Sequence, residues 1–272
     1  MFQLKSVVIT GAGSGIGKAL TEMFLEQGAI VWALDKAEAS LIPLVQAAHK
    51  AGKTVHSVVA DVTDRSALES AAAQVKAKHG SLDIWVNNAG VAGLGAFQEL
   101  SNEQFEKVIA INLNAVVAGT RIALQQMEKQ GAGTIVNVAS VAGHIPSAFM
   151  TAYCTSKHAV VGFTRSLTEE LRLSRSGVKL CLVSPGFVDT AILAKGQRMG
   201  FPAWLQWLLA TPEGVAREVI RGIQEGREEV FPTRNGRWML HVNKVLPRVT
   251  RRGAKVLMAK SFSDLVTNRY RV

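Results

Sequence analysis

The stretch "SVVITGAGSGIGKAL", residues 6–20, joins a short apolar, β-branched run to a glycine-rich turn and then to a helical pattern. Between a strand and a helix, glycines permit a tight turn, let the backbone approach a pyrophosphate and aim the helix N-terminus at it. The spacing is G-x-x-x-G-x-G, through Gly11, Gly15 and Gly17, rather than the more common G-x-G-x-x-G. The stretch predicts a dinucleotide-binding unit, with Ser14 and Ile16 inside its turn.

The same alternation of strand and helix continues along the chain. Further strands are predicted at 29–35, 54–61, 83–88, 133–140, 178–186 and 228–232. Helices are predicted near 15–27, 39–51, 65–79, 101–129, 153–174 and 212–225. Strands that are apolar throughout and alternate with helices are typical of a parallel sheet covered on both faces. We therefore expect an α/β fold, a Rossmann-type doubly wound seven-stranded parallel sheet, in a single domain over residues 1–233.

Composition limits the class of protein. The chain has 272 residues, of which 48% are hydrophobic and 19% charged, enough to bury a sizeable core. Cys154 and Cys181 have no paired spacing, so we expect neither a disulfide framework nor a metal site, and a reducing compartment. No signal-peptide pattern and no apolar run of about 18 residues occurs. The expectation is a soluble, cytoplasmic protein.

The net charge of +10 is concentrated at the C-terminus. From Arg234 onward there are ten Lys and Arg residues and one acidic residue, Asp264, a charge of +9 that leaves +1 for residues 1–233. We expect a basic C-terminal extension over residues 234–272 behind a nearly neutral domain. Because the extension contains no recognised nucleic-acid module, nucleic-acid binding is not expected.

Acidic residues end two of the predicted strands. Asp35 closes the second strand, where a carboxylate can accept hydrogen bonds from adenosine ribose hydroxyls and repel a 2′-phosphate. This favours NAD over NADP, although Lys36 next to it can attract that phosphate. Asp35 can instead be a helix cap or a turn residue. After the third strand, Asp61 and Val62 can meet the adenine, and a turn role for Asp61 is the alternative.

Five further motifs follow in order along the chain. They are "NNAG" at 87–90, Asn112 in "INLN", Ser140 in "VNVAS", Tyr153 with Lys157 in "AYCTSKHAV", and "PG" at 185–186. Together with the glycine turn, these motifs resemble the short-chain dehydrogenase/reductase (SDR) family over roughly residues 4–232. The resemblance implies a nicotinamide-dependent enzyme acting on a CH–OH group. It also implies a homodimer or homotetramer that assembles through helices at about 101–129 and 153–174.

The resemblance assigns roles to four residues. Tyr153 is the expected general acid/base, and a phenol with a pKa near 10 needs its anion stabilised to act at neutral pH. Lys157, one helical turn along, supplies that charge and binds the nicotinamide ribose. Ser140 donates to the substrate oxygen, and Asn112 holds a water that links Lys157 to solvent.

Each of these residues also has a purely structural interpretation. Residues four apart touch on any helix, so the spacing of Tyr153 and Lys157 alone proves nothing. Ser140 can be a strand-end turn residue, and Asn112 can stabilise a helix bend. Asn87 and Asn88 can be a structural pair that bonds the backbone between strands.

Two loops complete the predicted cofactor site. We expect "NNAG" to shape the site through its backbone, with Asn87 and Gly90 nearest the dinucleotide. The predicted binding residues in this loop are Asn88, Ala89 and Gly90. In "SPGFVDT" at 184–190, Pro185 and Gly186 fix the turn, Val188 offers backbone to the nicotinamide carboxamide, and Thr190 bonds the carboxamide or a phosphate.

The segment 191–210 is the expected lid over the substrate. It carries Phe201, Trp204, Trp207, Leu208 and Leu209. Ile145, Phe149 and Met150 lie near the same pocket, whereas His144 is expected to be a polar loop residue. An apolar cover of this kind favours a lipophilic alcohol or ketone. The alternative is that the lid packs against another subunit.

The C-terminal extension repeats apolar residues at helical spacing among basic ones. Its apolar positions are Trp238, Val242, Val245 and Val249, and its basic positions include Arg237, Lys244, Arg248, Arg251 and Arg252. Such a segment can lie on an anionic membrane surface as a peripheral contact. It can equally pack on the domain or on a partner subunit, because Pro247 and Gly253 interrupt any long helix.

The sequence thus predicts an NAD(H)-dependent oxidoreductase that transfers hydride to or from a lipophilic secondary alcohol or ketone. Two alternatives remain open: an NADPH-dependent carbonyl reductase, and a nucleotide-sensing or membrane-associated binding protein without turnover.

Overall fold

The computed structural model describes residues 2–189 and 209–245. Its seven strands form one sheet in the order β3-β2-β1-β4-β5-β6-β7, and every neighbouring pair is parallel. The strands are β1 (Ser6–Thr10), β2 (Ile30–Asp35), β3 (Val55–Val59), β4 (Ile84–Asn87), β5 (Gly133–Val138), β6 (Val178–Val183) and β7 (Glu229–Val230). The predicted Rossmann-type doubly wound sheet is confirmed.

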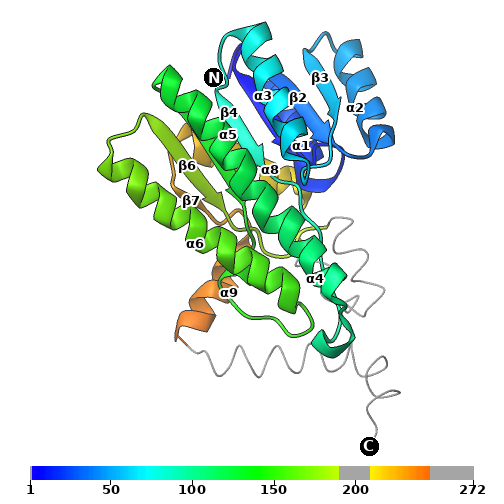
Figure 1. Cartoon of the computed structure of the whole chain (residues 1–272), viewed down its shortest axis with the longest axis vertical. Coiled ribbons are helices and arrows are strands. Elements are labelled where there is room, and N and C mark those ends of the chain that lie inside the picture. The colour runs from blue at the N-terminus through cyan, green and yellow to red at the C-terminus, as the bar shows by residue number, and fades with distance from the viewer. Residues whose placement is uncertain (1, 190–208, 246–272) are drawn as a thin grey trace, which may run out of the picture.

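Helices cover both faces of the sheet (Figure 1). The helices are α1 (Gly15–Glu26), α2 (Glu38–Lys50), α3 (Arg65–His79), α4 (Asn102–Ile109), α5 (Ala115–Gln130), α6 (Thr151–Leu173), α8 (Pro212–Gln224) and α9 (Arg234–Val245). Short helical turns occur at η1 (Phe97–Glu99), η2 (Ala110–Asn114) and η3 (Val141–Gly143). α1, α2 and α8 bury apolar side chains on one face, and α3 and α5 do so on the other.

The sheet separates two apolar cores. Phe24 and Leu41 lie in the core under α1 and α2, and Trp85 and Met127 lie in the core under α3 and α5. Burial of large apolar side chains on both faces is the main stabilising contribution in such a fold. Because β1 pairs with both β2 and β4, the strand order reverses beside β1. Ligands of doubly wound sheets bind at the carboxyl ends of the strands at such a reversal.

The predicted helix over 101–129 is interrupted. A π turn, η2, separates α4 from α5 and contains Asn112. The Asn112 side chain is fully buried and bonds the backbone of Val91 in both directions, which accounts for the widened turn. The stretch Asn102–Gln130 is long and apolar enough to span a membrane, but half of its most apolar 18-residue window is buried inside the domain, as in a core helix.

Candidate active site

The glycine turn between β1 and α1 depends on close backbone approach. A Cβ added to Gly17 would lie 2.0 Å from the carbonyl oxygen of Gly11, and one added to Gly11 would lie 2.9 Å from Ala89 Cα. Gly11 and Gly15 have positive φ angles of 65° and 51°, which side chains rarely adopt. The N-cap residue of α1, Ser14, makes no side-chain cap. The turn therefore offers free backbone donors at a helix N-terminus, which suits a pyrophosphate.

Asn88 fastens the end of β4 to this turn. Its Nδ2 donates to the carbonyl oxygens of Thr10 at 2.9 Å and Gly11 at 3.2 Å. In return, the backbone N–H groups of Asn88 and Ala89 donate to Thr10 Oγ1 at 3.0 and 3.1 Å. The structure thus brings the predicted residues of the first and fourth strands together, and Asn88 has the structural role that the sequence allowed.

Asn87 turns its side chain the other way. Its Oδ1 accepts from Trp85 Nε1 at 2.7 Å, and its Nδ2 donates to Asn137 Oδ1 at 2.8 Å and to Thr120 Oγ1 at 3.1 Å. These side chains are all buried between the sheet and α5. The Asn87 side chain therefore does not face the predicted cofactor site beside the glycine turn. We had expected Asn87 to be among the residues nearest the dinucleotide. Sequence reasoning missed Asn137 and Thr120, since polar residues inside apolar runs carry no motif.

Asp35 lies where the sequence placed it, at the carboxyl end of β2. Its two oxygens accept from the backbone N–H groups of Gly13 and Ala37, each at 3.0 Å. The carboxylate therefore ties the glycine turn to the start of α2. A carboxylate has about four lone-pair sites, so both oxygens keep capacity for ribose hydroxyls. Lys36 beside it is exposed.

Asp61 has the local partners of a turn residue. Its Oδ1 accepts from the Thr63 backbone at 2.9 Å and from Thr63 Oγ1 at 2.7 Å, and these bonds hold the pKa of the exposed carboxyl below its usual value. Val62 packs against the core under α3. The turn role predicted as the alternative for Asp61 is present, and the adenine contact stays a prediction.

Ser140, Tyr153 and Lys157 meet at the carboxyl ends of β5 and β6. The hydroxyl of Tyr153 is hydrogen-bonded to the Ser140 side chain. Lys157 Nζ lies 5.8 Å from the centroid of the Tyr153 ring and donates to the carbonyl oxygen of Val138 at 2.8 Å. Two further ammonium protons of Lys157 remain for other acceptors. Three of the four residues that the sequence assigned to catalysis therefore form one cluster.

Burial sets the acid–base properties of this cluster. It raises the pKa of the Tyr153 phenol above its usual value of 10.0, and the hydrogen bond with Ser140 opposes that rise. Burial also lowers the pKa of Lys157 from 10.5 to about 8. The ammonium does not bring the Tyr153 pKa below its usual value in the free protein, although the sequence argument relied on its attraction for the phenolate. Desolvation by burial is the largest cause of the pKa shift of each group.

Asn112 and Gly90 lie next to Lys157. Asn112 Oδ1 accepts from the Val91 backbone at 2.8 Å, and its Nδ2 donates to the Val91 carbonyl at 2.9 Å and to Ser156 Oγ at 3.1 Å. A Cβ added to Gly90 would lie 3.3 Å from Asn112 Oδ1 and 3.7 Å from Lys157 Nζ. The helix-bend role of Asn112 is thus visible, and a water between Asn112 and Lys157 stays a prediction.

The loop after β6 lies against Ser140 and Val141. The Pro185 carbonyl accepts from the Val141 backbone at 2.8 Å and from Ser140 Oγ at 3.4 Å. The Gly186 N–H donates to Thr233 Oγ1 at 2.9 Å. Sequence reasoning missed Thr233, which lies 47 residues further along the chain than Gly186. Val188 is buried, whereas Thr190 lies outside the described residues.

Two loops beside the cluster contain the described residues that we predicted to line the substrate pocket. The Phe149 carbonyl accepts from the Gly95 N–H at 2.9 Å, and Phe149 has a positive φ angle of 60°. His144 Nε2 is 2.9 Å from Ser184 Oγ, so its ring serves the loop structure, as expected. Ile145 and Met150 lie in the same loop as Phe149. The predicted lid residues Phe201, Trp204, Trp207 and Leu208 lie outside the described residues.

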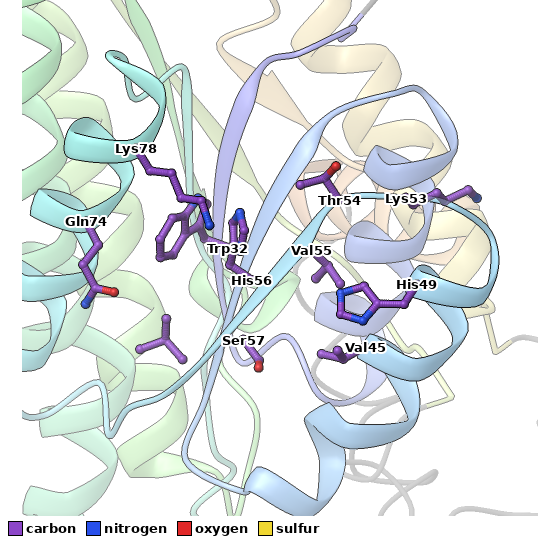
Figure 2. A pocket seen from close by; sticks show the side chains of 11 residues that line it. Trp32, Val45, His49, Lys53, Thr54, Val55, His56, Ser57, Gln74 and Lys78 are labelled. Carbon is purple, nitrogen blue, oxygen red and sulfur yellow. The ribbon is translucent and has the colours of Figure 1, made fainter.

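A separate surface hollow of about 630 Å³ lies against the edge strand β3 (Figure 2). Lys78 and Trp32 line it on one side of the strand, and His49 lines it on the other. The ring nitrogens Trp32 Nε1 and His56 Nε2 are buried without a hydrogen-bond partner, so they are not open to a ligand there. The hollow includes the amino end of β3, opposite to the catalytic cluster, and does not compete with it as the functional site.

Residues 2–189 and 209–245 contain no group of three or more His, Cys, Asp or Glu side chains arranged for a metal ion.

The comparisons with known proteins point to one family. Residues 5–199 match the model of the short chain dehydrogenase family. Estradiol 17-beta-dehydrogenase 11 from Homo sapiens is 34% identical over 89% of this chain and 79% of its own length. 15-hydroxyprostaglandin dehydrogenase [NAD(+)] from Rattus norvegicus is 40% identical over 72% of this chain and 74% of its own length.

A third relative, the probable oxidoreductase EphD of Mycobacterium tuberculosis, is 34% identical over 92% of this chain. The chain spans only 44% of the length of EphD. Among solved structures, a short chain dehydrogenase/reductase from Burkholderia phymatum in complex with NAD has a TM-score of 0.82 at 29% identity, covering 91% of this chain and 95% of that one.

The chain belongs to the short-chain dehydrogenase family. Membership places its domain among oxidoreductases that act on CH–OH groups and bind a nicotinamide cofactor.

Proposed function

We propose that the chain transfers a hydride between NAD(H) and a lipophilic secondary alcohol or ketone. The observation that carries the proposal is the contact of Ser140, Tyr153 and Lys157 beside the glycine turn. A bound nicotinamide supplies or accepts the hydride. The chain's own residues orient the substrate and move its proton.

The cluster can perform the proton transfer as follows. Ser140 Oγ donates to the substrate oxygen, which stabilises negative charge that develops there. The Tyr153 hydroxyl exchanges a proton with the same oxygen, and the nearby Lys157 ammonium favours the phenolate that results. Because the pKa of Lys157 is about 8, the ammonium loses its charge above that pH. Asn112 holds the water that reaches Lys157 in this proposal.

Asp35 supports NAD over NADP. Its carboxylate is fixed by Gly13 and Ala37 at the end of β2, where a 2′-phosphate would meet negative charge. NAD is also named for the rat relative and for the Burkholderia structure. Comparison of NADH and NADPH binding by fluorescence tests this assignment. Tighter binding of NADPH than of NADH would show that the charge of Lys36 outweighs that of Asp35. In Asp35→Asn, the ratio of NADH affinity to NADPH affinity should fall by about tenfold.

The substrate class rests on the apolar residues of the loops beside the cluster, Ile145, Phe149 and Met150, and on the predicted lid. The relatives are named for estradiol and for a hydroxyprostaglandin. The experiment follows reduced-nicotinamide absorbance with NAD⁺ and secondary alcohols of increasing chain length. Each buried methylene contributes about 0.8 kcal/mol, so kcat/KM should rise about fourfold per methylene. If NADH binds but no alcohol or ketone reacts, the binding protein without turnover replaces this proposal.

Assembly and location belong to the same proposal. We infer a cytoplasmic homodimer or homotetramer assembled through α4, α5 and α6, as members of this family typically oligomerise. Independently of the chemistry, we propose that the C-terminal extension makes a peripheral contact with a membrane. Sedimentation velocity tests the assembly, and a monomer at micromolar concentration would contradict it.

A further inference from the structure

Helix α9 exposes an apolar face. Trp238 is 68% exposed and Val245 is 60% exposed, and Val242 between them is partly buried. Positions four and seven residues apart lie on one side of a helix, so these three side chains form a single stripe, which we call the α9 face. A large exposed tryptophan beside other apolar residues marks an interaction surface.

Basic side chains flank the α9 face along one side. Arg234, Arg237 and Lys244 are exposed and form no ion pair with any residue that the structure describes. The helix contains no acidic residue, and the sequence from Arg234 to the C-terminus carries a charge of +9. The face is therefore suited to a negatively charged, partly apolar partner. If two copies of the chain associated through their α9 faces, two segments of charge +9 would meet. Their mutual repulsion opposes self-association through this face.

The start of α9 is attached to the catalytic loops. Thr233 Oγ1 accepts from the N–H groups of Gly186 at 2.9 Å and Gly236 at 3.2 Å. Asn235 Nδ2 donates to the Phe187 carbonyl at 3.3 Å. Gly236 is buried, and a Cβ added to it would lie 2.9 Å from Val141 Cγ1, the residue after Ser140. Figure 1 shows α9 leaving the body of the domain at the end where α6, with Tyr153 in its first turn, begins.

We propose that the α9 face docks on an anionic phospholipid bilayer and thereby holds the mouth of the active site at the membrane surface. Trp238, Val242 and Val245 enter the boundary between headgroups and acyl chains. Arg234, Arg237 and Lys244 on the flank of the face pair with phosphate and carboxylate groups. The substrate then reaches the Ser140–Tyr153 cluster from the bilayer. This last step rests on the proposed function; the docking does not.

The experiment measures co-sedimentation of the full chain with two kinds of vesicle, pure phosphatidylcholine and equal parts phosphatidylcholine and phosphatidylserine. The full chain should bind the phosphatidylserine vesicles more tightly, and added salt should weaken that binding. Trp238→Ser should weaken it at least tenfold, since an inserted aromatic side chain contributes about 1.5–3 kcal/mol. Arg237→Gln should weaken it about fivefold, since each cation near an anionic surface contributes about 1 kcal/mol.

Matched controls are available at the far end of α6 and on α3. Leu173 is 86% exposed and Lys76 is exposed, so Leu173→Ser and Lys76→Gln remove similar groups outside the α9 face and should leave vesicle binding unchanged. Equal losses in the controls and in the α9 variants would overturn the proposal. Unchanged vesicle binding by Trp238→Ser would overturn it as well. If that variant instead loses its oligomer in sedimentation velocity, the α9 face belongs to a second copy.

A kinetic measurement separates this inference from the proposed function. With a vesicle-dissolved alcohol, Trp238→Ser should raise KM about tenfold and leave kcat unchanged. With a water-soluble alcohol, both parameters should match those of the unchanged chain. Absence of turnover with every alcohol, together with Trp238-dependent vesicle binding, would contradict the proposed function and retain the docking. If, for each alcohol, Trp238→Ser and the unchanged chain have the same KM, delivery of the substrate from the membrane would be overturned.

Discussion

The glycine turn and Asn88, which we call the cofactor edge, come before the Ser140–Tyr153 cluster in the sequence, and helix α9 comes after it. The two regions differ in whether their side chains have partners inside the domain. At the cofactor edge, Asn88 donates to two carbonyl oxygens and Gly17 approaches Gly11 too closely for any side chain. On α9, Trp238 and Val245 face solvent beside exposed basic side chains. The first region is therefore fixed by contacts within the domain, whereas the second presents groups that the described domain does not use.

This difference separates two kinds of effect that a substitution can have. A change at the cofactor edge alters folding, cofactor binding and chemistry together, because each group has partners inside the domain. A change on the α9 face should alter only interactions with an outside partner. Substitutions in the two regions should therefore differ in which properties of the protein they change.

Tyr153→Phe should remove the chemistry and spare the fold. The substitution deletes the hydroxyl that is bonded to Ser140 and leaves the ring beside Lys157. Loss of a general acid/base costs about 10²–10⁴ in rate, so we expect kcat to fall about a thousandfold and NADH affinity to change less than about twofold. Stopped-flow turnover and NADH fluorescence measure both. Turnover within tenfold of the unchanged chain would show that another group carries the proton.

Gly17→Ala should disrupt the glycine turn between β1 and α1. The new Cβ would lie 2.0 Å from the Gly11 carbonyl oxygen and 2.5 Å from Asn88 Nδ2, so the turn has to open. We expect a loss of about 3 kcal/mol in the free energy of unfolding, as for strong overpacking, and loss of NADH binding.

Gly162→Ala is the matched control for that substitution. Gly162 lies within α6, and an added Cβ meets nothing within 4 Å. Alanine in a helix interior is favoured over glycine by about 0.5–1 kcal/mol, so this variant should be slightly more stable. Urea unfolding of both variants decides the point. Equal stability of Gly17→Ala and the unchanged chain would contradict the crowding that defines the turn.

Lys157→Met should abolish turnover and raise the free energy of unfolding at pH 7. Burial lowers the pKa of Lys157 from 10.5 to about 8, so the folded state binds fewer protons than the unfolded state between these values and stability rises with pH there. Below about pH 8 the buried ammonium lowers the free energy of unfolding of the unchanged chain by up to about 3 kcal/mol. Lys157→Met removes this cost but leaves the Val138 carbonyl without its donor, so the net gain in stability is smaller.

Urea unfolding at several pH values tests this sign. The variant should exceed the unchanged chain in stability at pH 7 and lose that advantage by about pH 10.5, while turnover is lost throughout. A variant that is less stable at pH 7 would show that the Val138 hydrogen bond and the charge together outweigh the desolvation.

Much of the cofactor edge was predictable from sequence because backbone geometry constrains residue type there. Gly11, with its positive φ, and Gly17, with no room for a Cβ, leave a visible spacing in the sequence. Tyr153 and Lys157 lie on one helix, so a fixed spacing reports their contact. The strands were found, although several are shorter than predicted, because the predicted ranges included motif residues such as Asp61, Ser140 and Gly186 that lie in the loops after the strands.

Other features depend on contacts between distant segments and left no local signal. Asn87 sits in a motif next to the cofactor turn, yet its side chain bonds Thr120 and Asn137 on the other side. Thr233 supports the Gly186 turn from 47 residues away. The interruption at Asn112 arises because that side chain bonds Val91 on another loop. Pairings of this kind become visible only when the fold brings the segments together.

The smallest effect is predicted for the stability of Trp238→Ser. Trp238 is 68% exposed, so little apolar surface returns to water when the domain unfolds, and surface substitutions away from specific contacts change stability by less than about 0.5 kcal/mol. Urea unfolding without vesicles should therefore give nearly the same midpoint for the variant and the unchanged chain. A loss of more than about 1 kcal/mol would mean that Trp238 packs inside the protein or against a second copy. In that case α9 and the cofactor edge would be two parts of one folded core, and the contrast between them would disappear.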